Sequence, residues 1–429
     1  MTIWADLGFT QSPYDTKSLP PTAIGERLLV GREAHIRRLV NRLASTSSHV
    51  TVEGESGVGK TSLITIANYR MKRNSDKARS PVLLPIEKPF QITTREGVKL
   101  LEAAVYRAIA EAFIRYRDEL QAWGYDAPKV ADVNKWMNSP IIKSIAAGVS
   151  AVGFSVNASR SESVNASSAF AESGLAHTVR TWMSECFDPP GCGYFVCVLD
   201  NLELLVSSTS ARQALEEIRD TILAEPGLRW VICGARGVVR TAAASPRLQG
   251  RLCHPLAVEP LSMDDAINAL EARIGEFSTG GAPPVGPIGF QYLYEVLKCN
   301  LRNTLQKCED FSFWLHDEEI LGVGEMEHVA LLQSWLTLLS DEYANNPNIS
   351  SDGWRLLDDM VDNEGSCDFE DYELFNFPSV DKMKRCAAEL ERQNLVEMSP
   401  GDTGMDSVVV APNGWLARFS RSGYQIPRT

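Results

Sequence analysis

The sequence lacks the features that would place the chain in a membrane or outside the cell. No apolar run approaches the roughly 18 residues of a membrane-spanning helix. Residues 1–6 do not combine a basic region with an apolar core, so we expect no secretory signal. The nine cysteines are odd in number and include no Cys-x-x-Cys pair, which argues against a disulfide framework. Even at Cys192 and Cys197, reduced thiols are favoured over a metal site. These absences predict a cytoplasmic protein without a membrane partner.

Positive charge is also scarce, above all toward the C-terminus. The whole chain has a net charge of −13. From Leu331 onward, 17 acidic residues against 8 basic ones give a balance of −9. A domain that binds nucleic acid usually presents a basic face, so we do not expect tight non-specific DNA binding by this segment alone.

What the sequence does contain is a complete P-loop. An apolar, strand-like run (residues 49–52) precedes it and a helix-like segment (residues 62–72) follows it, which is the setting that a phosphate chain requires. Lys60 would reach the β- and γ-phosphates, and the Thr61 hydroxyl would ligate Mg²⁺. We therefore predict binding of ATP with Mg²⁺. The candidate nucleotide-binding residues of this stretch are Gly54, Glu55, Ser56, Gly57, Val58, Gly59, Lys60, Thr61 and Ser62.

Strand-like and helix-like segments alternate on both sides of the P-loop. Apolar runs at 81–87, 194–199 and 228–233 are separated by helical patterns, which predicts an α/β fold with a buried parallel sheet of the P-loop NTPase type. With 429 residues there is room for two or three domains. Residues 124–167 are rich in Gly, Ala and Ser; both a contact element for a partner and a flexible insertion remain open.

The second half of the chain has a different pattern. Residues 262–276 and 288–316 have helical spacing and predict a helical lid. Several helices and two strands then follow in a winged-helix order, with residues 380–393 at the position of the recognition helix. The expected domains are an extended N-terminal segment (1–27), the ATPase core (28–260, with the insertion), the lid (261–328) and the winged-helix domain (329–429).

Two carboxylates follow the strand at 194–199. Asp200 at the end of this strand suits an octahedral Mg²⁺ site, with a strand-end cap as the less favoured alternative. Glu203 could orient the attacking water if a helical turn follows the strand; otherwise it is an ordinary solvated glutamate. We therefore name Asp200 as a metal ligand and Glu203 as the catalytic carboxylate.

Arginines are the other candidates near the phosphates. Arg236 follows the next strand and could stabilise and sense the γ-phosphate. Arg302 lies at a position in the lid from which it could touch the nucleotide. Arg251 or Arg247 could act as an arginine finger on a neighbouring subunit. For each of these, an exposed surface arginine is the alternative interpretation.

In this order, the pieces resemble the AAA+ and STAND branches of the P-loop ATPases. The resemblance covers about residues 25–415 and also includes Val30-Gly-Arg-Glu33, which implies that Val30, Gly31 and Arg32 contact the nucleotide. The layout is similar to that of origin-recognition-type initiators, whose winged helix binds duplex DNA. The spacing of Asp200 and Glu203 is instead similar to that of STAND ATPases such as the NACHT group, because initiators usually place the glutamate where this chain has Asn201.

The resemblance leaves two roles for the winged helix. In STAND proteins it clamps the ADP state, whereas in initiators it meets DNA. The expected recognition helix mixes both signs of charge, which favours a protein-facing or intramolecular role. Its charged residues are Lys382, Lys384, Arg385, Arg392, Asp381, Glu389 and Glu391.

We therefore predict an ATP-hydrolysing molecular switch whose nucleotide state controls assembly with a protein partner. Hydrolysis is expected to be slow and partner-stimulated, in a homo- or hetero-oligomer. By analogy with STAND switches, the partner would be a separate effector in a defence or stress system. The alternative is a DNA-loading ATPase of the initiator or transposition type. A metabolic kinase is disfavoured, since it would leave the lid and winged helix without a role.

Overall fold

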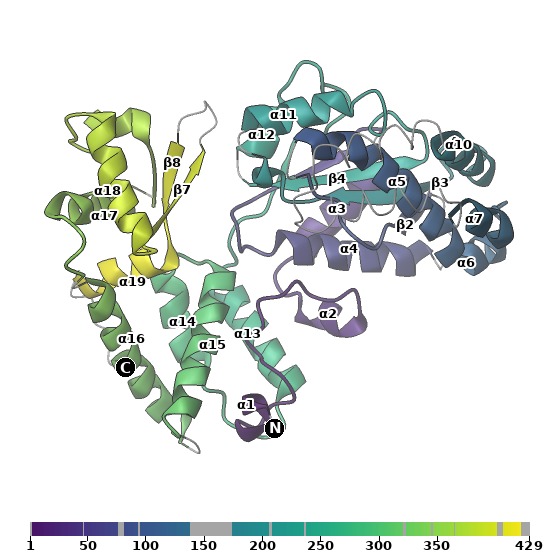
Figure 1. Cartoon of the computed structure of the whole chain (residues 1–429). Helices are drawn as coiled ribbons and strands as arrows, with labels where there is room; N and C mark the ends of the chain where they lie inside the picture. Colours follow the sequence, from purple (N-terminus) through teal and green to yellow (C-terminus); the bar gives the residue numbers. More distant parts are fainter. Residues whose placement is uncertain are drawn as a thin grey trace.

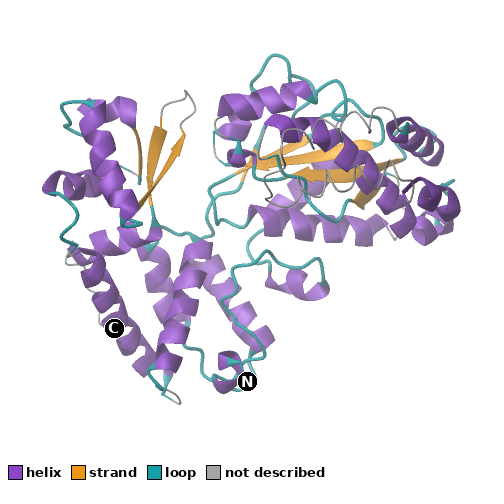
Figure 2. Ribbon diagram, viewed as in Figure 1, coloured by secondary structure: helices purple, strands orange, loops and turns teal. Residues whose placement is uncertain are grey.

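The computed structural model describes residues 2–45, 47–75, 81–92, 95–137, 174–205, 208–235, 237–320, 323–344, 346–363, 365–400 and 406–421. Within these ranges the chain forms an α/β core, a helical lid and a winged-helix domain that stands on the lid across from the core (Figure 1, Figure 2). This architecture confirms the predicted fold class. The domain boundaries stay a prediction, and most of the expected insertion lies outside the described residues.

The core is built on a parallel sheet in which the strand that leads into the P-loop lies between two other strands. Among the described residues, five strands lie in the order β2-β3-β4-β1-β5. Their bounds are β1 Val50–Glu53, β2 Val82–Pro85, β3 Gly193–Leu199, β4 Leu228–Gly234 and β5 Leu256–Ala257. β1 pairs with β4 on one side and β5 on the other. β1 and β2 are buried along their whole length, as expected for strands covered on both faces; β2 is apolar throughout, whereas β1 also contains Thr51 and Glu53.

Helices cover both faces of this sheet. On one face, Val50 and Val52 pack with side chains of α3 (Glu33–Ser45) and α4 (Lys60–Ser75). On the other face, Phe195 and Trp230 pack with a second set of helices. That set comprises α5 (Arg95–Arg115), α10 (Leu175–Cys186), α11 (Ser208–Glu217) and α12 (Val238–Ala243), with α6 (Arg117–Ala122) and α7 (Val130–Met137) beside α5.

The lid differs from the prediction in one respect. Its helices are α13 (Met263–Phe277), α14 (Pro287–Val296) and α15 (Leu301–Asp317). The single helix expected over 288–316 is therefore two helices. Between them, Lys298 and Cys299 adopt left-handed backbone angles (φ 54° and 59°), which an α-helix cannot contain.

The N-terminal segment was expected to be extended, but it is partly helical and packed against the lid. It contains α1 (Ile3–Asp6) and α2 (Ala23–Leu28). Its apolar residues Phe9 and Tyr14 are buried, so they hold the segment in place despite the surrounding Pro and Ser. The Tyr14 hydroxyl donates to the Val285 carbonyl (2.8 Å) and accepts from the Val285 N–H (2.9 Å).

The winged-helix domain has its own core and a small antiparallel sheet in the order β6-β8-β7. The long helix α16 (Glu325–Ala344) leads into it, and α19 packs back against α16. The remaining elements are α17 (Ser351–Asp362), β6 (Ser366–Asp368), a 3-10 helix (Phe369–Glu373), α18 (Val380–Arg392), β7 (Val396–Pro400), β8 (Asp406–Val410) and α19 (Pro412–Arg421). Within the described part of the chain, no helix combines the length and hydropathy that crossing a bilayer requires.

We expect Tyr14→Phe to lower the free energy of unfolding by about 1–3 kcal/mol, because it leaves the buried N–H and C=O of Val285 without this partner. Urea unfolding followed by circular dichroism measures the loss. Tyr372→Phe is the control, since that hydroxyl bonds to Glu373 in an exposed pair. An equal effect of both substitutions would contradict the anchoring role of Tyr14.

Candidate nucleotide-binding site

The P-loop joins β1 to α4 through a backbone that only glycines allow. Gly57 and Gly59 have φ angles of 85° and 92°, in the region that favours glycine. A Cβ on Gly54 would lie 2.5 Å from the carbonyl oxygen of Val258. The shape of the loop therefore depends on glycine for two different reasons, torsion at Gly57 and Gly59 and close packing at Gly54.

Lys60, Thr61 and Asp200 converge beside this loop. Lys60 is only 6% exposed, and its Nζ donates to the carbonyls of Gly54 (2.8 Å) and Glu55 (2.9 Å). The Thr61 hydroxyl donates to Asp200 Oδ2 across 2.9 Å, and Asp200 is 2% exposed. The ammonium can exchange neutral carbonyls for phosphate oxygens, and the hydroxyl and carboxylate oxygens suit Mg²⁺. The residues present thus fit a nucleotide with its metal.

The Val30-Gly-Arg-Glu33 segment lies between the P-loop and the lid. Arg32 is buried (4% exposed) and its Nη2 donates to the Val58 carbonyl at 2.9 Å. Burial lowers the pKa of Arg32, while Tyr294, Asp265 and Glu259 oppose that shift. A Cβ on Gly31 would lie 2.7 Å from the carboxyl carbon of Asp265 in α13. The segment therefore carries a cation into the P-loop and packs tightly against the lid.

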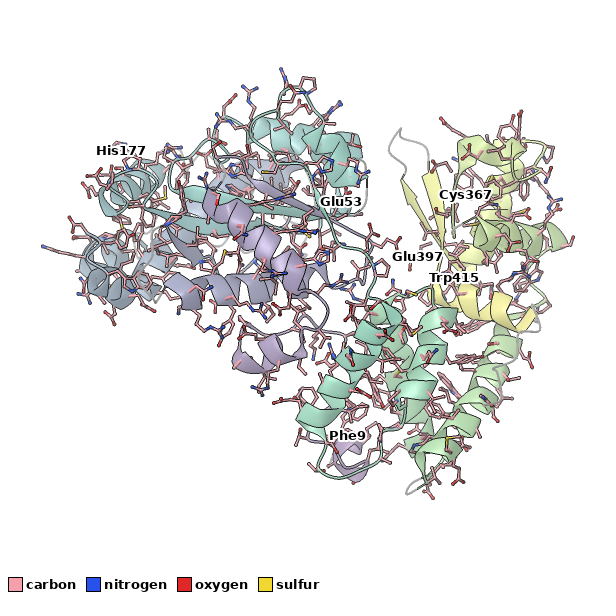
Figure 3. The ribbon with its side chains drawn as sticks, turned by 180° about the vertical axis from the view of Figure 1, so that it is seen from behind. Phe9, Glu53, His177, Cys367, Glu397 and Trp415 are labelled. Atoms are coloured by element: carbon pink, nitrogen blue, oxygen red, sulfur yellow. The ribbon has the colours of Figure 1, made fainter. Side chains whose placement is uncertain are left out.

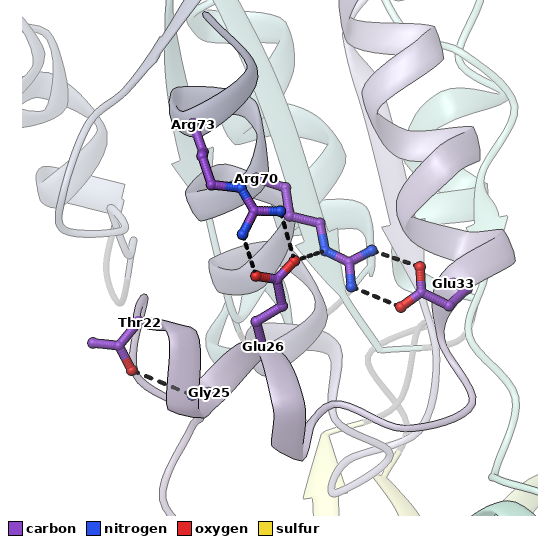
Figure 4. A network of polar contacts seen from close by, with 6 residues as sticks. All are labelled: Thr22, Gly25, Glu26, Glu33, Arg70 and Arg73. Atoms are coloured by element: carbon purple, nitrogen blue, oxygen red, sulfur yellow. Dashed lines mark hydrogen bonds and ion pairs between the residues drawn. The ribbon is translucent and has the colours of Figure 1, made fainter. Parts of the chain in front are cut away.

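An arginine network fixes this segment to the P-loop helix (Figure 4). Arg70 of α4 donates through both Nη atoms to Glu33 (2.6 and 2.7 Å) and through Nε to Glu26 of α2 (2.7 Å). Arg73 also pairs with Glu26. The hydrogen bond from Arg70 lowers the pKa of the Glu33 carboxyl. Glu33, the last residue of the Val-Gly-Arg-Glu motif, thus helps to position Arg32.

The lid reaches the P-loop through the start of α15. The Asn300 side-chain amide donates to the Ser56 carbonyl at 2.9 Å, while its Oδ1 accepts from the Asn303 N–H at 3.2 Å and caps the helix. A Cβ on Gly57 would lie 2.4 Å from Asn300 Oδ1 and 3.1 Å from Arg302 Cβ. The structure thus places Arg302 beside the P-loop. Ser62, at the start of α4, accepts from the Leu19 N–H at 3.1 Å.

The chain turns sharply after Asp200. Asn201 has a φ of 59°, and a 3-10 helix (Leu202–Leu204) follows. This is the helical turn on which the predicted role of Glu203 depended. The Glu203 side chain, and all of Arg236, lie outside the described residues. Their roles stay predictions.

The two candidate arginine fingers lie away from the P-loop of their own chain. Arg247 pairs with Glu216 at 3.3 Å. The carbonyl of Arg251 accepts from the His49 N–H, at the edge of the sheet where β1 begins rather than where it ends at the P-loop. Their predicted role as arginine fingers on a neighbouring subunit stays a prediction.

Two residues near the P-loop were not identified from the sequence. Asn300 gave the signal of a helix cap, but nothing in the sequence indicated its P-loop partner. Glu53, the last residue of β1, is 1% exposed; its Oε1 accepts from Arg240 of α12, and its Oε2 has no hydrogen-bond partner among the described residues. For Glu53, the available signal in the sequence was a carboxylate at the end of a strand-like run.

Comparison with known proteins agrees with this arrangement. The family model described as Novel STAND NTPase 1 matches residues 23–277, more than half of the chain. No curated protein matches. The ORC2 protein of Aeropyrum pernix (ADPNP-ADP complexes) is similar, with 14% identity, coverage of 97% of this chain and 100% of that one, and a TM-score of 0.44. The ORC1 protein of the same organism in complex with DNA has 15% identity, with coverage of 96% of this chain and 97% of that one, and a TM-score of 0.45.

A third similar structure, CDC6P of Pyrobaculum aerophilum, has 13% identity, coverage of 97% and 100%, and a TM-score of 0.37. All three TM-scores are below 0.5, so the assignment rests on the P-loop geometry, the strand order and the family match. The chain belongs to the novel STAND NTPase 1 family.

Proposed function

We propose that the protein is an ATP-binding and ATP-hydrolysing switch whose nucleotide state controls assembly with a protein partner. The observation that carries this proposal is the contact of the lid with the P-loop through Asn300 and Arg302. A P-loop held from the lid can transmit a change at the phosphates to the domain that the lid supports. The family assignment supports the nucleotide part of the proposal.

Binding would use the groups that now converge on the P-loop. Lys60 would hold the β- and γ-phosphates, and Thr61 and Asp200 would hold Mg²⁺. Bound Mg²⁺ would neutralise charge on those phosphates. Arg32 keeps the Val58 peptide in place. Arg302 lies beside the P-loop, from where its guanidinium would reach the nucleotide. Val30 and Gly31 contribute shape rather than charge.

Hydrolysis would rest on Glu203 and Arg236. Glu203 lies in the turn directly beyond Asp200, from which a carboxylate can orient water and accept its proton. Arg236, which follows β4 in the sequence, would stabilise charge on the γ-phosphate. Arg251 or Arg247 would complete the site of a neighbouring subunit, which makes slow turnover of the isolated chain and stimulation by assembly the expected behaviour.

The proposal favours a protein partner over DNA because the cations of the winged helix are already engaged. Lys382 pairs with Asp352 at 2.9 Å, and the Lys384 ammonium lies over the Phe369 ring at 5.2 Å. Arg385 and Arg392 each bond through Nε to a backbone carbonyl of their own helix. Binding phosphates would compete with these contacts, in a segment that is strongly acidic overall.

The partner would be an effector carried by a separate polypeptide, in a defence or stress system, which follows the analogy with STAND switches. We place the protein in the cytoplasm, in keeping with the free thiols of all nine cysteines. DNA loading is the second candidate, and the winged-helix domain itself is the observation that favours it.

Glu203→Gln should bind ATP with near-normal affinity but lower the hydrolysis rate by about 100-fold or more, because the amide cannot accept a proton. Lys60→Ala should lose ATP binding. Phosphate release and binding of a fluorescent ATP analogue measure the two properties separately. Glu271→Gln, an exposed glutamate of α13, is the control. Unchanged turnover in Glu203→Gln would remove Glu203 from the mechanism.

Duplex DNA at physiological salt should change the ATPase rate by less than about twofold, because the winged-helix cations are paired and the domain is acidic. The rate is measured with and without DNA, with Lys60→Ala as the blank. Strong stimulation by DNA that is absent in the blank would favour the initiator-type alternative.

A further inference from the structure

The turn between α14 and α15 is a strained segment that contacts the P-loop through Asn300. Lys298 and Cys299 are consecutive non-glycine residues in the left-handed region, a conformation that persists only where its surroundings enforce it. The Cys299 N–H donates to the Tyr294 carbonyl at 2.8 Å, and the Asn300 N–H to the Leu297 carbonyl at 3.2 Å. Tyr294 is itself buried and donates to the Leu261 carbonyl. The lid thus holds this turn in a defined shape.

One end of the turn is attached to the P-loop. The Asn300 amide binds the Ser56 carbonyl, and the same side chain caps α15. Lys60 binds the carbonyls of the two preceding residues, Gly54 and Glu55. A phosphate that draws Lys60 away from those carbonyls therefore releases the peptide groups of Gly54 and Glu55. These two groups lie directly before the Ser56 carbonyl that Asn300 holds.

The other end of the turn is attached to the winged-helix domain. The Lys298 ammonium lies 5.1 Å from the ring centroid of Trp415 in α19. Trp415 packs against both the lid core and the winged-helix core, and Figure 3 shows it where the domain meets the lid. Its ring also leaves no room for a side chain at Gly365, since a Cβ there would lie 2.4 Å from Trp415 Cζ2.

The boundary between the lid and the winged-helix domain is closely packed in one part, where Leu416 of α19 is buried in the lid core, and hollow in another. A cavity of about 410 Å³ is lined by Gln306 and Lys307 of α15 on one side and by Glu397 of β7 and Asn413 of α19 on the other. A change in the tilt of the winged helix on the lid would open or close this space.

We propose that Lys298-Cys299-Asn300 is the coupling element between the P-loop and the winged helix. Asn300 is a positioning residue that responds to the P-loop carbonyls, and Lys298 transmits the change to Trp415. When Asn300 loses its hydrogen bond to the Ser56 carbonyl, the left-handed turn loses one of the contacts that enforce it. The Lys298 ammonium then shifts relative to the Trp415 indole. This inference rests on the proposed nucleotide switch and names the residues that regulate it.

The test is a double-mutant cycle on nucleotide preference. The ratio of dissociation constants for ADP and for a non-hydrolysable ATP analogue is measured in wild type, Asn300→Ala, Trp415→Leu and the double variant. We expect Trp415→Leu to change this ratio by about fivefold or more, although Trp415 lies in another domain. In the double variant the Trp415→Leu step should have no further effect, because the connection is already broken.

Lys298→Ala serves as a second variant, since it removes the ammonium and leaves the indole packed; it should shift the ratio in the same direction. Gln291→Ala is the control, because Gln291 is an exposed lid residue whose amide bonds to Glu295 within α14. Its ratio should equal that of wild type. Additive effects of Asn300→Ala and Trp415→Leu, or an unchanged ratio in both Trp415→Leu and Lys298→Ala, would overturn the coupling. Failure of the wild-type chain to bind either nucleotide would overturn the proposed function as well.

Discussion

The carbonyl oxygens of the P-loop are the point on which the rest of the structure depends. Lys60 binds those of Gly54 and Glu55, Asn300 binds that of Ser56, and Arg32 binds that of Val58. These donors come from the P-loop helix, the lid and the segment ahead of the core. Four carbonyls of the loop are therefore oriented from three different parts of the molecule, and a change at bound phosphates would affect all three.

This arrangement explains why the lid and the N-terminal segment are packed so closely around the core. Arg32 is placed by Glu33 and Arg70, and Asn300 is placed by its own helix cap. The segment that contains Tyr14 joins the lid to the region of the P-loop helix, where Leu19 bonds to Ser62. The winged helix, in contrast, meets this assembly through the lid, with Trp415 at the boundary. Contacts from the lid and the N-terminal segment thus surround the nucleotide site, while the winged-helix domain joins the lid through a shared core that includes Leu416.

Much of the fold and the central part of the site could be predicted from sequence because their signals are local. The P-loop carries its own glycines, Asp200 directly ends an apolar strand, and strand–helix alternation indicates a parallel sheet. Long-range contacts gave no such signal: Asn300 bonds to a residue 244 positions away, and Tyr14 to one 271 positions away. The break between α14 and α15 was also missed, because Lys298 and Cys299 turn the chain without the glycine or proline that usually marks a turn.

The central claim is that nucleotide state sets the position of the winged helix relative to the core. The most direct measurement is the distance distribution between probes at two exposed sites, Gln213 on α11 and Arg392 on α18, in the ADP state and with a non-hydrolysable ATP analogue. The account predicts two distinct distributions in wild type and a single, nucleotide-independent one in Lys60→Ala. Identical distributions in both nucleotide states of the wild-type protein would contradict it.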